Sequence, residues 1–319
     1  MGELLRELNP DVALGMMHYP SALVVLGARL ARVRTRTVAS YRGPFYEYMR
    51  HYESGYRRRL FLRAVVAGTA LLADRVIVPS CGTALELRRR FFTPLSRTVA
   101  IPNGIDHAAV ARLSSTANLT LAPQGDWMRT SRRDSDKGIS SPPLLCAIAR
   151  LAPEKHLELL LDAFRLVRAA HPARLIILGD GPERATLEAR IADWGLSDAV
   201  SMLGHHENIY PYLCRADLFI HTCQFEGFGY TLLEALACGT PVISTDCPYG
   251  PREILGNSEY GVLVPPDDPA LLAAAISRLL AHPMERQALA AGGLKRAREL
   301  SVQRMADAYT AEFMKLVLS

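Results

Sequence analysis

Six short apolar segments alternate with amphipathic ones in the second half of the chain, and this alternation constrains the fold more than any other feature. The apolar segments are residues 144–149, 174–180, 200–204, 217–222, 241–245 and 261–265. Most of the segments between them have helical periodicity, as in residues 156–170. Strands joined by helical crossovers pair in parallel, so we predict an α/β fold with a doubly wound sheet.

The first half of the chain shows the same alternation less regularly. Strands are expected over residues 11–17, 37–41, 75–80 and 98–102, and helices over residues 21–31, 57–73 and 83–92. A stretch rich in tyrosine and arginine, residues 41–59, leads into the second of these helices. This order of elements also indicates a parallel sheet.

The length of the chain, 319 residues, suits two domains of ordinary size. Residues 114–143 are rich in Ser, Thr, Arg and Pro and lack periodicity, which is typical of an exposed linker. We therefore predict a first domain over residues 1–113, a second over residues 144–300 and a C-terminal helix over residues 301–319.

The cysteine pattern and the hydropathy argue against several classes of protein. The six cysteines form no C-x-x-C pair, which disfavours a zinc ribbon, a redox motif or a disulfide-dense secreted scaffold. No apolar run approaches the roughly 20 residues that a membrane-spanning helix needs. His205, His206 and His221 lack the spacing of a metal site. We expect a cytoplasmic protein with no membrane-spanning helix and no bound metal.

Charge is divided unevenly along the chain. Residues 1–141 have a net charge of +10, and residues 142–319 a net charge of −5. The excess in the first part is almost entirely arginine, with triplets at 57–59 and 88–90. Such arginines suit phosphate binding, an anionic membrane surface or nucleic acid, and solvated helix faces would have the same composition. Nucleic acid is the weakest of these alternatives, because the sequence contains no recognisable nucleic-acid-binding module.

Two cations follow the first strand of the second domain. Sheets of this type bind ligands at the carboxyl ends of their strands. Arg150 comes directly after that strand, and Lys155 lies beside the start of the next helix. Two cations at a strand-to-helix turn would form an anion site, although isolated cations of this kind also occur as ordinary surface residues. The sequence GDGP, residues 179–182, follows the second strand and predicts a tight turn.

The most specific segment is QFEGFGYTLLEALACGTPVIST, residues 224–245. Glu226 ends a loop, and Gly227, Phe228 and Gly229 open a helix whose free amide groups can face a phosphate. Glu234 lies two turns inside this apolar helix, where a carboxylate needs hydrogen-bond donors. The hydroxyls of a sugar or a ribose would provide them.

These segments resemble a known family. The run ARLAPEKHLELLLDAF, the GDGP turn, the pair Glu226 and Glu234 and the run DCPYGPREIL are similar to the nucleotide-sugar domain of retaining glycosyltransferases of the GT-B fold. That large family includes bacterial lipopolysaccharide, capsule and glycolipid glycosyltransferases. The resemblance covers about residues 144–300, and upstream it continues more loosely through ADRVIVPS and IPNGID.

The resemblance implies transfer of a sugar from a nucleoside diphosphate donor with retention at the anomeric carbon, without a cofactor or a protein-bound metal. It implies that Arg150 and Lys155 neutralise the departing diphosphate. The departing phosphate oxygen itself would take the acceptor proton on the same face. The remaining implied roles are phosphate binding by the amides of Gly227, Phe228 and Gly229, sugar binding by Glu226, ribose binding by Glu234 and base binding by the backbone of Gly204 and His205.

The implied architecture is two Rossmann-like domains facing a cleft, with the first domain on the acceptor side. His18, which follows a strand of that domain, would face the donor sugar or have a structural role. The family normally opens with a strand and a glycine-rich loop, whereas this chain begins on a late helix. We therefore expect the first domain to be incomplete, by about 60 to 80 residues at roughly 30 residues per βαβ unit. A misplaced start codon, a fragment or degenerate paralogue, or a second chain would each explain this.

The acceptor implied by the family is lipid-linked or a polysaccharide. Together with the arginine excess, this predicts a cytosolic enzyme that touches an anionic membrane surface, and no nucleic-acid partner. An alternative is a noncatalytic nucleotide-sugar-binding or partner subunit that keeps the donor domain. A third hypothesis is another GT-B enzyme such as a sugar-nucleotide epimerase.

Overall fold

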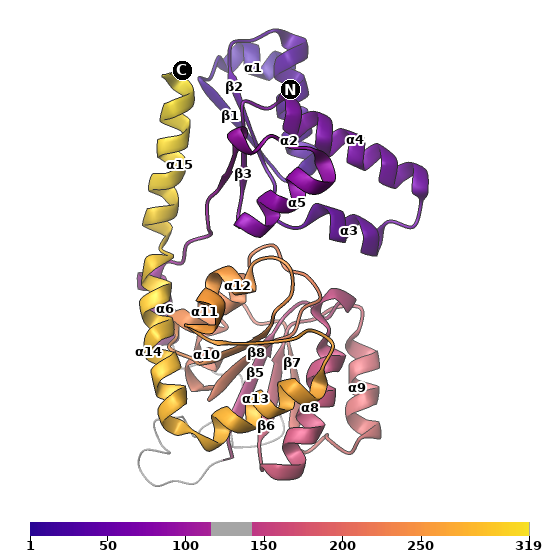
Figure 1. The fold of residues 1–319 in the computed structure, drawn as a ribbon, viewed down its shortest axis with the longest axis vertical. Coiled ribbons are helices and arrows are strands. Elements are labelled where there is room, and N and C mark those ends of the chain that lie inside the picture. The colour runs from indigo at the N-terminus through magenta and orange to yellow at the C-terminus, as the bar shows by residue number, and fades with distance from the viewer. Residues whose placement is uncertain (116–141, 319) are drawn as a thin grey trace.

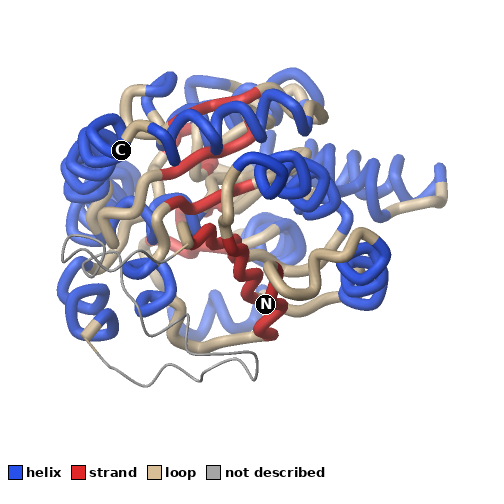
Figure 2. Tube along the Cα trace, turned by 90° about the horizontal axis from the view of Figure 1, so that it is seen from below, coloured by secondary structure: helices blue, strands red, loops and turns tan. Residues whose placement is uncertain are grey.

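The computed structural model describes residues 1–115 and 142–318 and contains two α/β domains, one above the other in Figure 1. Each domain is built on one parallel sheet. In Figure 2 the strands, in red, lie between helices drawn in blue. The expectation of two Rossmann-like α/β domains is confirmed. Most of the predicted linker, residues 116–141, lies outside the described residues.

The sheet of the first domain has the order β1-β2-β3-β4. Its strands are β1 (Val12–Met16), β2 (Arg36–Ser40), β3 (Arg75–Val78) and β4 (Thr98–Ala100). Its helices are α1 (Gly2–Leu8), α2 (His18–Ala31), α3 (Phe45–Tyr52), α4 (Tyr56–Leu72) and α5 (Cys81–Phe91), with a 3-10 turn at Leu95–Arg97. The next helix, α6 (His107–Ser114), packs on the second domain, where Val110 is part of the core. Each strand lies within the segment predicted for it or one residue beyond it.

The sheet of the second domain has the order β10-β9-β8-β5-β6-β7. Its strands are β5 (Leu144–Ile148), β6 (Arg174–Leu178), β7 (Val200–Gly204), β8 (Leu218–His221), β9 (Val242–Thr245) and β10 (Val262–Val264). The chain adds strands on one side of β5 first and then, from β8 onward, on the other side. The ends of β5 and β8 therefore mark the point where the strand order reverses, at which sheets of this type bind ligands.

Helices cover both faces of this second sheet. They are α8 (Leu157–Ala170), α9 (Arg184–Asp193), α10 (Tyr210–Arg215), α11 (Tyr230–Ala237), α12 (Pro251–Ile254), α13 (Pro269–Ala281) and α14 (Pro283–Glu299), with 3-10 turns at Pro153–Lys155 and Gly256–Ser258. On one face Leu160 and Phe164 of α8 are fully buried against the strands. On the other face Leu232 and Leu236 of α11 are fully buried. The sheet is thus buried on both faces, which explains why its strands are continuous apolar runs.

The last described helix, α15 (Val302–Val317), returns to the first domain. Its residue Leu316 packs with Val38 and Ile77 on one face of the first sheet. A salt bridge of 3.2 Å joins Glu312 of α15 to Arg75 at the start of β3. The end of the chain therefore ties the two domains together.

No described helix combines the length and the apolarity needed to cross a membrane.

Candidate functional site

A cavity of about 350 Å³ lies between the two domains. Its walls come from segments that directly follow strands, because the carboxyl ends of both sheets face it. The first domain contributes Met17 and His18 after β1 and residues 41–45 after β2, and the second contributes Arg150 after β5 and Glu226 after β8. The wall also includes Tyr48, Glu154, Lys155, Phe225 and Gly227.

A second cavity, of about 410 Å³, lies beside the first and within the second domain. It is lined by the segments that follow β5, β6 and β7, together with Thr231 in the first turn of α11. His205 and His206 belong to this wall. Arg150 lines both cavities, so this residue lies where they meet.

The GDGP turn packs tightly against the segment that carries Arg150. A side chain on Gly179 would collide with the carbonyl oxygen of Ala149, and its φ of +125° favours glycine. The amide of Leu151 donates to the carbonyl of Asp180 at 2.9 Å. The predicted tight turn is confirmed, and its effect is to hold the backbone on both sides of Arg150.

Lys155 and Glu226 form an ion pair inside the first cavity. The Lys155 ammonium donates to Glu226 Oε2 at 2.7 Å, and the amide of Gly227 donates to Glu226 Oε1 at 3.0 Å. Burial disfavours both charged forms, but the neighbouring Cys223 sulfur and Glu226 carboxylate hold the pKa of Lys155 above its ordinary value. Likewise His221 and Lys155 overcome burial and hold the pKa of Glu226 well below its usual range. Both groups are therefore charged at neutral pH.

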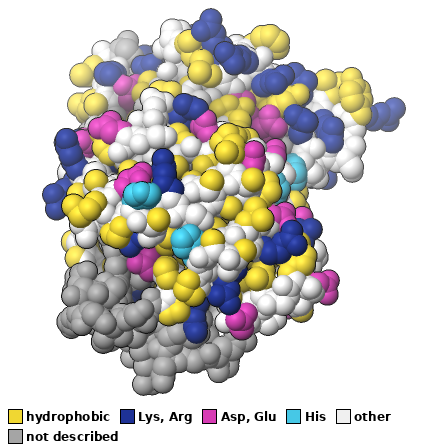
Figure 3. All heavy atoms as spheres, turned by 60° about the horizontal axis from the view of Figure 1, so that its bottom comes forward, with side chains coloured by type: hydrophobic (Ala, Val, Ile, Leu, Met, Phe, Trp, Pro, Cys, Tyr) yellow, Lys and Arg dark blue, Asp and Glu magenta, His cyan; other side chains and the backbone are white. Residues whose placement is uncertain are grey.

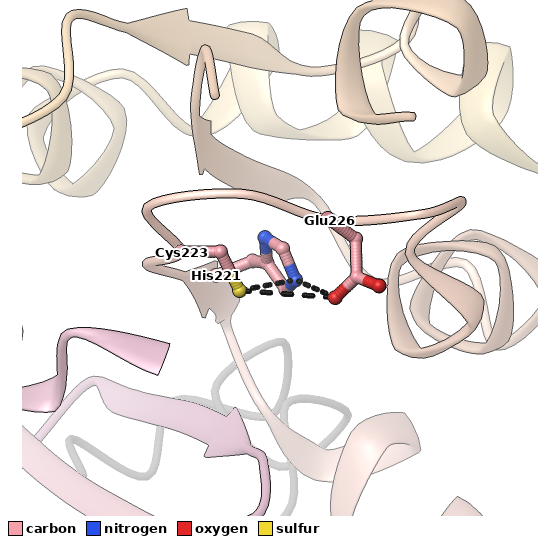
Figure 4. A group of neighbouring side chains, drawn as sticks. All are labelled: His221, Cys223 and Glu226. Carbon is pink, nitrogen blue, oxygen red and sulfur yellow. Dashed lines mark hydrogen bonds and ion pairs between the residues drawn. The ribbon is translucent and has the colours of Figure 1, made fainter. Parts of the chain in front are cut away.

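The Glu226 carboxylate also lies close to His221 and Cys223, at and just after the end of β8 (Figure 4). His221 Nε2 lies 3.2 Å from Cys223 Sγ and 3.7 Å from Glu226 Oε2. These atoms are close enough to ligate one metal ion, a grouping that the spacing along the sequence did not indicate. The ammonium of Lys155, however, already contacts the same carboxylate oxygen. The group is therefore better described as an ion-pair network.

Arg150 is held by an aromatic cluster from the other domain. Its Nη2 donates to Glu154 Oε1 at 2.6 Å and to the hydroxyls of Tyr48 and Tyr52, each at 3.2 Å. The Tyr52 hydroxyl is also hydrogen-bonded to Glu154 Oε2. Burial raises the pKa of Glu154, but the hydrogen bonds from Tyr52 and Arg150 more than compensate and lower it. Two tyrosines of α3 and a buried carboxylate thus fix the guanidinium across the domain interface.

The sequence analysis did not predict this cluster, because it assigned no helix or strand to the residues of α3. A signal was present: Tyr48 and Tyr52 are four residues apart, between Pro44 and Gly55, and four residues is the spacing of neighbours on one helix face. The carboxylate of Glu154 also went unremarked, although it lies between the two predicted cations.

The predicted glycine segment has more than one role in the structure. Gly227 approaches the other domain so closely that a Cβ would lie 2.6 Å from Gly43 Cα, and its carbonyl accepts a 3.1 Å hydrogen bond from Ser80 Oγ. Phe228 packs in the core of the second domain, so its ring faces neither cavity. Gly229 caps α11 with a φ of +95°.

Glu234 is buried in α11 and accepts a hydrogen bond of 3.3 Å from the Tyr210 hydroxyl. Burial raises the pKa of Glu234 to about 7, although the Tyr210 hydrogen bond opposes this rise. It lies three residues after Thr231, which lines the second cavity. Gly204, which precedes His205, accepts a 2.7 Å hydrogen bond from the amide of Gly179.

His18 lies in the wall of the first cavity, as the sequence suggested. Its ring packs on Phe45 with 4.6 Å between centroids, and burial lowers its pKa. The structure therefore brings His18, Arg150, Lys155 and Glu226 into one cavity, and His205 into the adjoining one.

Two family models match the chain. The model described as glycosyl transferases group 1 matches residues 130–296, and the model described as glycosyltransferase family 4 matches residues 1–109. The first of these covers more than half of the chain.

The chain is also similar to curated relatives and to solved structures. An exopolysaccharide phosphotransferase of Streptomyces coelicolor is 31% identical over 88% of this chain and 26% of its own length. The N-acetylgalactosamine-N,N'-diacetylbacillosaminyl-diphospho-undecaprenol 4-alpha-N-acetylgalactosaminyltransferase of Campylobacter jejuni is 36% identical over 39% of this chain and 33% of its own length. The crystal structure of Anabaena HepE in complex with UDP superposes with a TM-score of 0.80 and 20% identity, over 98% of this chain and 80% of HepE. The chain thus spans about a third or less of these two relatives.

The aromatic cluster at Arg150 generates a prediction about stability. Replacing Tyr52 with Phe leaves the buried Glu154 carboxylate without one donor, so we expect the free energy of unfolding at pH 7 to fall by about 1–3 kcal/mol. Urea unfolding followed by circular dichroism measures this change. Tyr48→Phe is the matched control, since the Tyr48 hydroxyl contacts Arg150 but has no hydrogen bond to Glu154, and its effect should be smaller.

The loss of stability in Tyr52→Phe should depend on pH. The pKa of Glu154 is lower in the folded than in the unfolded protein, so the stability that its ionisation contributes is present above its ordinary pKa of about 4.3 and is lost as pH falls through the lower folded value. The difference between wild type and Tyr52→Phe should therefore shrink in acid. A difference that stayed constant between pH 7 and pH 3 would contradict this interpretation.

Proposed function

The chain belongs to the glycosyl transferases group 1 family, and from this premise we propose that it transfers a sugar from a nucleoside diphosphate sugar to an acceptor hydroxyl, with retention at the anomeric carbon. One observation carries the proposal. Arg150 lies where the two cavities meet, and Lys155 lines the one between the domains. A diphosphate placed at Arg150 would put the nucleoside in one cavity and the sugar in the other.

The two cations would stabilise the leaving group. When the bond between the anomeric carbon and the phosphate oxygen breaks, negative charge develops on the diphosphate, and fixed cations at that point lower the barrier. Arg150 is fixed by Tyr48, Tyr52 and Glu154, and Lys155 by Glu226. These cations supply the charge that a metal ion would otherwise provide, so we propose a metal-independent reaction.

The acceptor proton would pass to the departing phosphate oxygen. On the same face of the sugar, the acceptor oxygen forms its bond to the anomeric carbon while its proton moves to the oxygen that leaves. The two carboxylates in the interdomain cavity are already engaged, Glu226 by Lys155 and Glu154 by Arg150 and Tyr52. Neither is placed as an unpaired general base, which supports this same-face route.

The remaining assignments are those that the family resemblance implies. We propose that Glu226 binds donor sugar hydroxyls from the interdomain cavity, that the backbone of Gly204 and His205 binds the base in the second cavity, and that Glu234 binds the ribose. The amides from Gly227 to Gly229 would face the diphosphate. Phe228 contributes its backbone alone, because its ring is buried in the core. The bound UDP in HepE supports a uracil nucleotide as the first donor to test.

The acceptor side would lie on the first domain, next to a membrane. The projecting end formed by α3 and α4 carries arginine and hydrophobic side chains, at the right of Figure 3. Tyr56, Leu60 and Phe61 are exposed there, next to the arginine triplet 57–59. Arg58 pairs with Glu53 at 2.9 Å, so part of the triplet also stabilises the turn before α4. The Campylobacter relative is named for a diphospho-undecaprenol acceptor, which supports a lipid-linked acceptor at an anionic inner membrane surface.

Ligand-induced melting tests the donor. UDP, GDP and ADP are added separately at about 100 times their dissociation constant, where a bound ligand stabilises the folded protein by about 2.7 kcal/mol. We expect one of the three to raise the melting temperature. No shift with any of them would contradict the proposed function. Binding without transfer to any acceptor would favour the alternative of a noncatalytic nucleotide-sugar-binding subunit.

Lys155→Ala should lower turnover at least about a hundredfold, because it removes a fixed charge from the developing negative charge. Single-turnover kinetics with the nucleotide sugar selected by the melting panel measure this step. Lys295→Ala, which removes an exposed lysine of α14, is the control and should leave the rate unchanged. An unaltered single-turnover rate in Lys155→Ala would remove Lys155 from the mechanism.

Affinity for the free nucleoside diphosphate should rise with pH through about 7. The pKa of Glu234 is raised to about 7, so its carboxylate, the form that accepts hydrogen bonds from ribose hydroxyls, is populated above that pH. Calorimetry between pH 5.5 and 8.5 tests this. Glu234→Gln should bind more weakly and lose the pH dependence, whereas Glu226→Gln should keep both the affinity and the pH dependence while impairing transfer. Equal effects of the two substitutions on the affinity for the free diphosphate would contradict the assignment.

Membrane contact is tested by cosedimentation with vesicles. Wild type should bind anionic vesicles more strongly than neutral ones at low salt, since each basic residue near such a surface contributes about 1 kcal/mol. Replacing Arg57, Arg58 and Arg59 by Ala in one variant should release the protein from the anionic vesicles, and so should added salt. The control replaces Lys295, Arg298 and Arg304, which removes equal charge from α14 and α15. Equal binding by the two triple variants would favour a soluble acceptor.

A further inference from the structure

The proposed function leaves one buried histidine beside the site without a role. His221 ends β8, is 5% exposed, and its Nε2 lies 3.7 Å from Oε2 of Glu226 (Figure 4), the oxygen that Lys155 also contacts. A buried imidazole with polar contacts on both nitrogens is held in one orientation, so its protonation can be worked out from its neighbours.

The contact at Nδ1 settles one of the two nitrogens. The Ser244 hydroxyl has a single proton, which it donates to the carbonyl of Thr245 at 2.9 Å. Toward His221 Nδ1, 3.1 Å away, the same oxygen can only accept. Nδ1 therefore carries a proton, and the state of the ring depends on Nε2 alone.

The contacts at Nε2 favour a second proton. Nε2 faces Glu226 Oε2 at 3.7 Å and Cys223 Sγ at 3.2 Å. The Cys223 thiol donates its single proton to Glu226 Oε2 at 3.8 Å, so toward Nε2 the sulfur accepts. An unprotonated Nε2 would direct its lone pair at a carboxylate oxygen, whereas a protonated one would direct positive charge there. The ring with both protons is an imidazolium, which makes it a second cation on the Glu226 carboxylate, after Lys155.

The other titratable groups that face His221, Lys155 and Glu226 are the thiols of Cys223 and Cys247, and they do not neutralise the positive charge. Burial raises the pKa of the Cys223 thiol and raises that of Cys247 to about 12, so both are neutral at pH 7. Burial lowers the pKa of His221, but the Glu226 carboxylate and the hydrogen bond to the Cys223 sulfur raise it above its ordinary value. Two cations and one carboxylate leave a net positive charge, which suits a site for an anionic donor.

We propose that His221 is a positioning residue that, as an imidazolium, holds Oε2 of Glu226 jointly with Lys155. The inference rests on the proposed function and deepens it. With Oε2 held from behind, Oε1 stays in the cavity on the Gly227 amide with a lone pair free for a sugar hydroxyl. Lys155 can then turn toward the diphosphate without leaving the buried carboxylate unpaired. His221 would therefore determine recognition of the sugar part of the donor and have little effect on the nucleotide part.

Two substitutions distinguish the roles of the two ring nitrogens of His221. The amide of His221→Gln can reach the Nε2 position and donate to Glu226, whereas that of His221→Asn can reach only the Nδ1 position and Ser244. The measurement is the ratio of two dissociation constants, for a free diphosphate and for its glucose conjugate, with UDP, GDP and ADP and their glucose conjugates as probes. We expect the preference for the conjugate to fall about tenfold in His221→Asn and about threefold in His221→Gln, with the affinity for the free diphosphate unchanged.

The control is His107→Asn, which removes a ring that contacts the Ala297 carbonyl far from Glu226, and it should leave the ratio unchanged. In wild type the preference should also fall at alkaline pH, where the imidazolium loses its proton, a change that His221→Gln should lack. Equal losses of affinity for the free and conjugated diphosphates would show that His221 is merely structural, and would overturn the proposal.

Nitrogen NMR of the histidine side chains gives a test that needs no ligand. In the wild-type protein at pH 7, His221, assigned by its absence in either variant, should have protons on both nitrogens. A neutral ring with a proton only on Nδ1 would overturn the proposal. If none of the three diphosphates binds the wild type, the proposed function fails, and this measurement still decides the state of His221.

Discussion

The ion pair between Lys155 and Glu226 is the interaction around which the site is organised. It joins the turn after β5 to the loop after β8, two neighbouring strands at the reversal point of the second sheet. The backbone follows the same connection, since the amide of Gln224 donates to the carbonyl of Glu154 at 2.9 Å. A partly buried pair of this kind is favourable only when the rest of its hydrogen-bonding capacity is met, and the Gly227 amide contributes to this on the Glu226 side.

The domain interface and the site are made of the same residues. Arg150 is held by tyrosines of α3, and the Ser80 hydroxyl donates to the Gly227 carbonyl. The carboxylate of Glu253 accepts hydrogen bonds of 2.9 and 2.7 Å from the amides of Cys81 and Gly82 at the start of α5. Any movement of one domain against the other would therefore alter the position of the Arg150 guanidinium.

The sequence predicted much of this arrangement because its signals are local. Arg150, Lys155 and Glu226 follow strands of one parallel sheet, and the ends of such strands meet at one edge, so their common location could be anticipated. The helix α3 could not be placed with the same assurance, because its short run of mixed tyrosines and charges has no long apolar stripe. The position of the Phe228 ring also escaped prediction, since a glycine-rich segment does not show which of its side chains turns into the core.

By itself the sequence determined the two parallel sheets and the residues at their strand ends, because periodicity and strand order are properties of neighbouring residues. Only the tertiary structure decided that Tyr52 meets Glu154, 102 positions away, and that His221 stands behind Glu226. The first contact depends on how two domains pack, and the second on the path of a loop that folds back over the end of its own strand. Neither arises from the local preferences of the residues involved, so no pattern in the chain contains them.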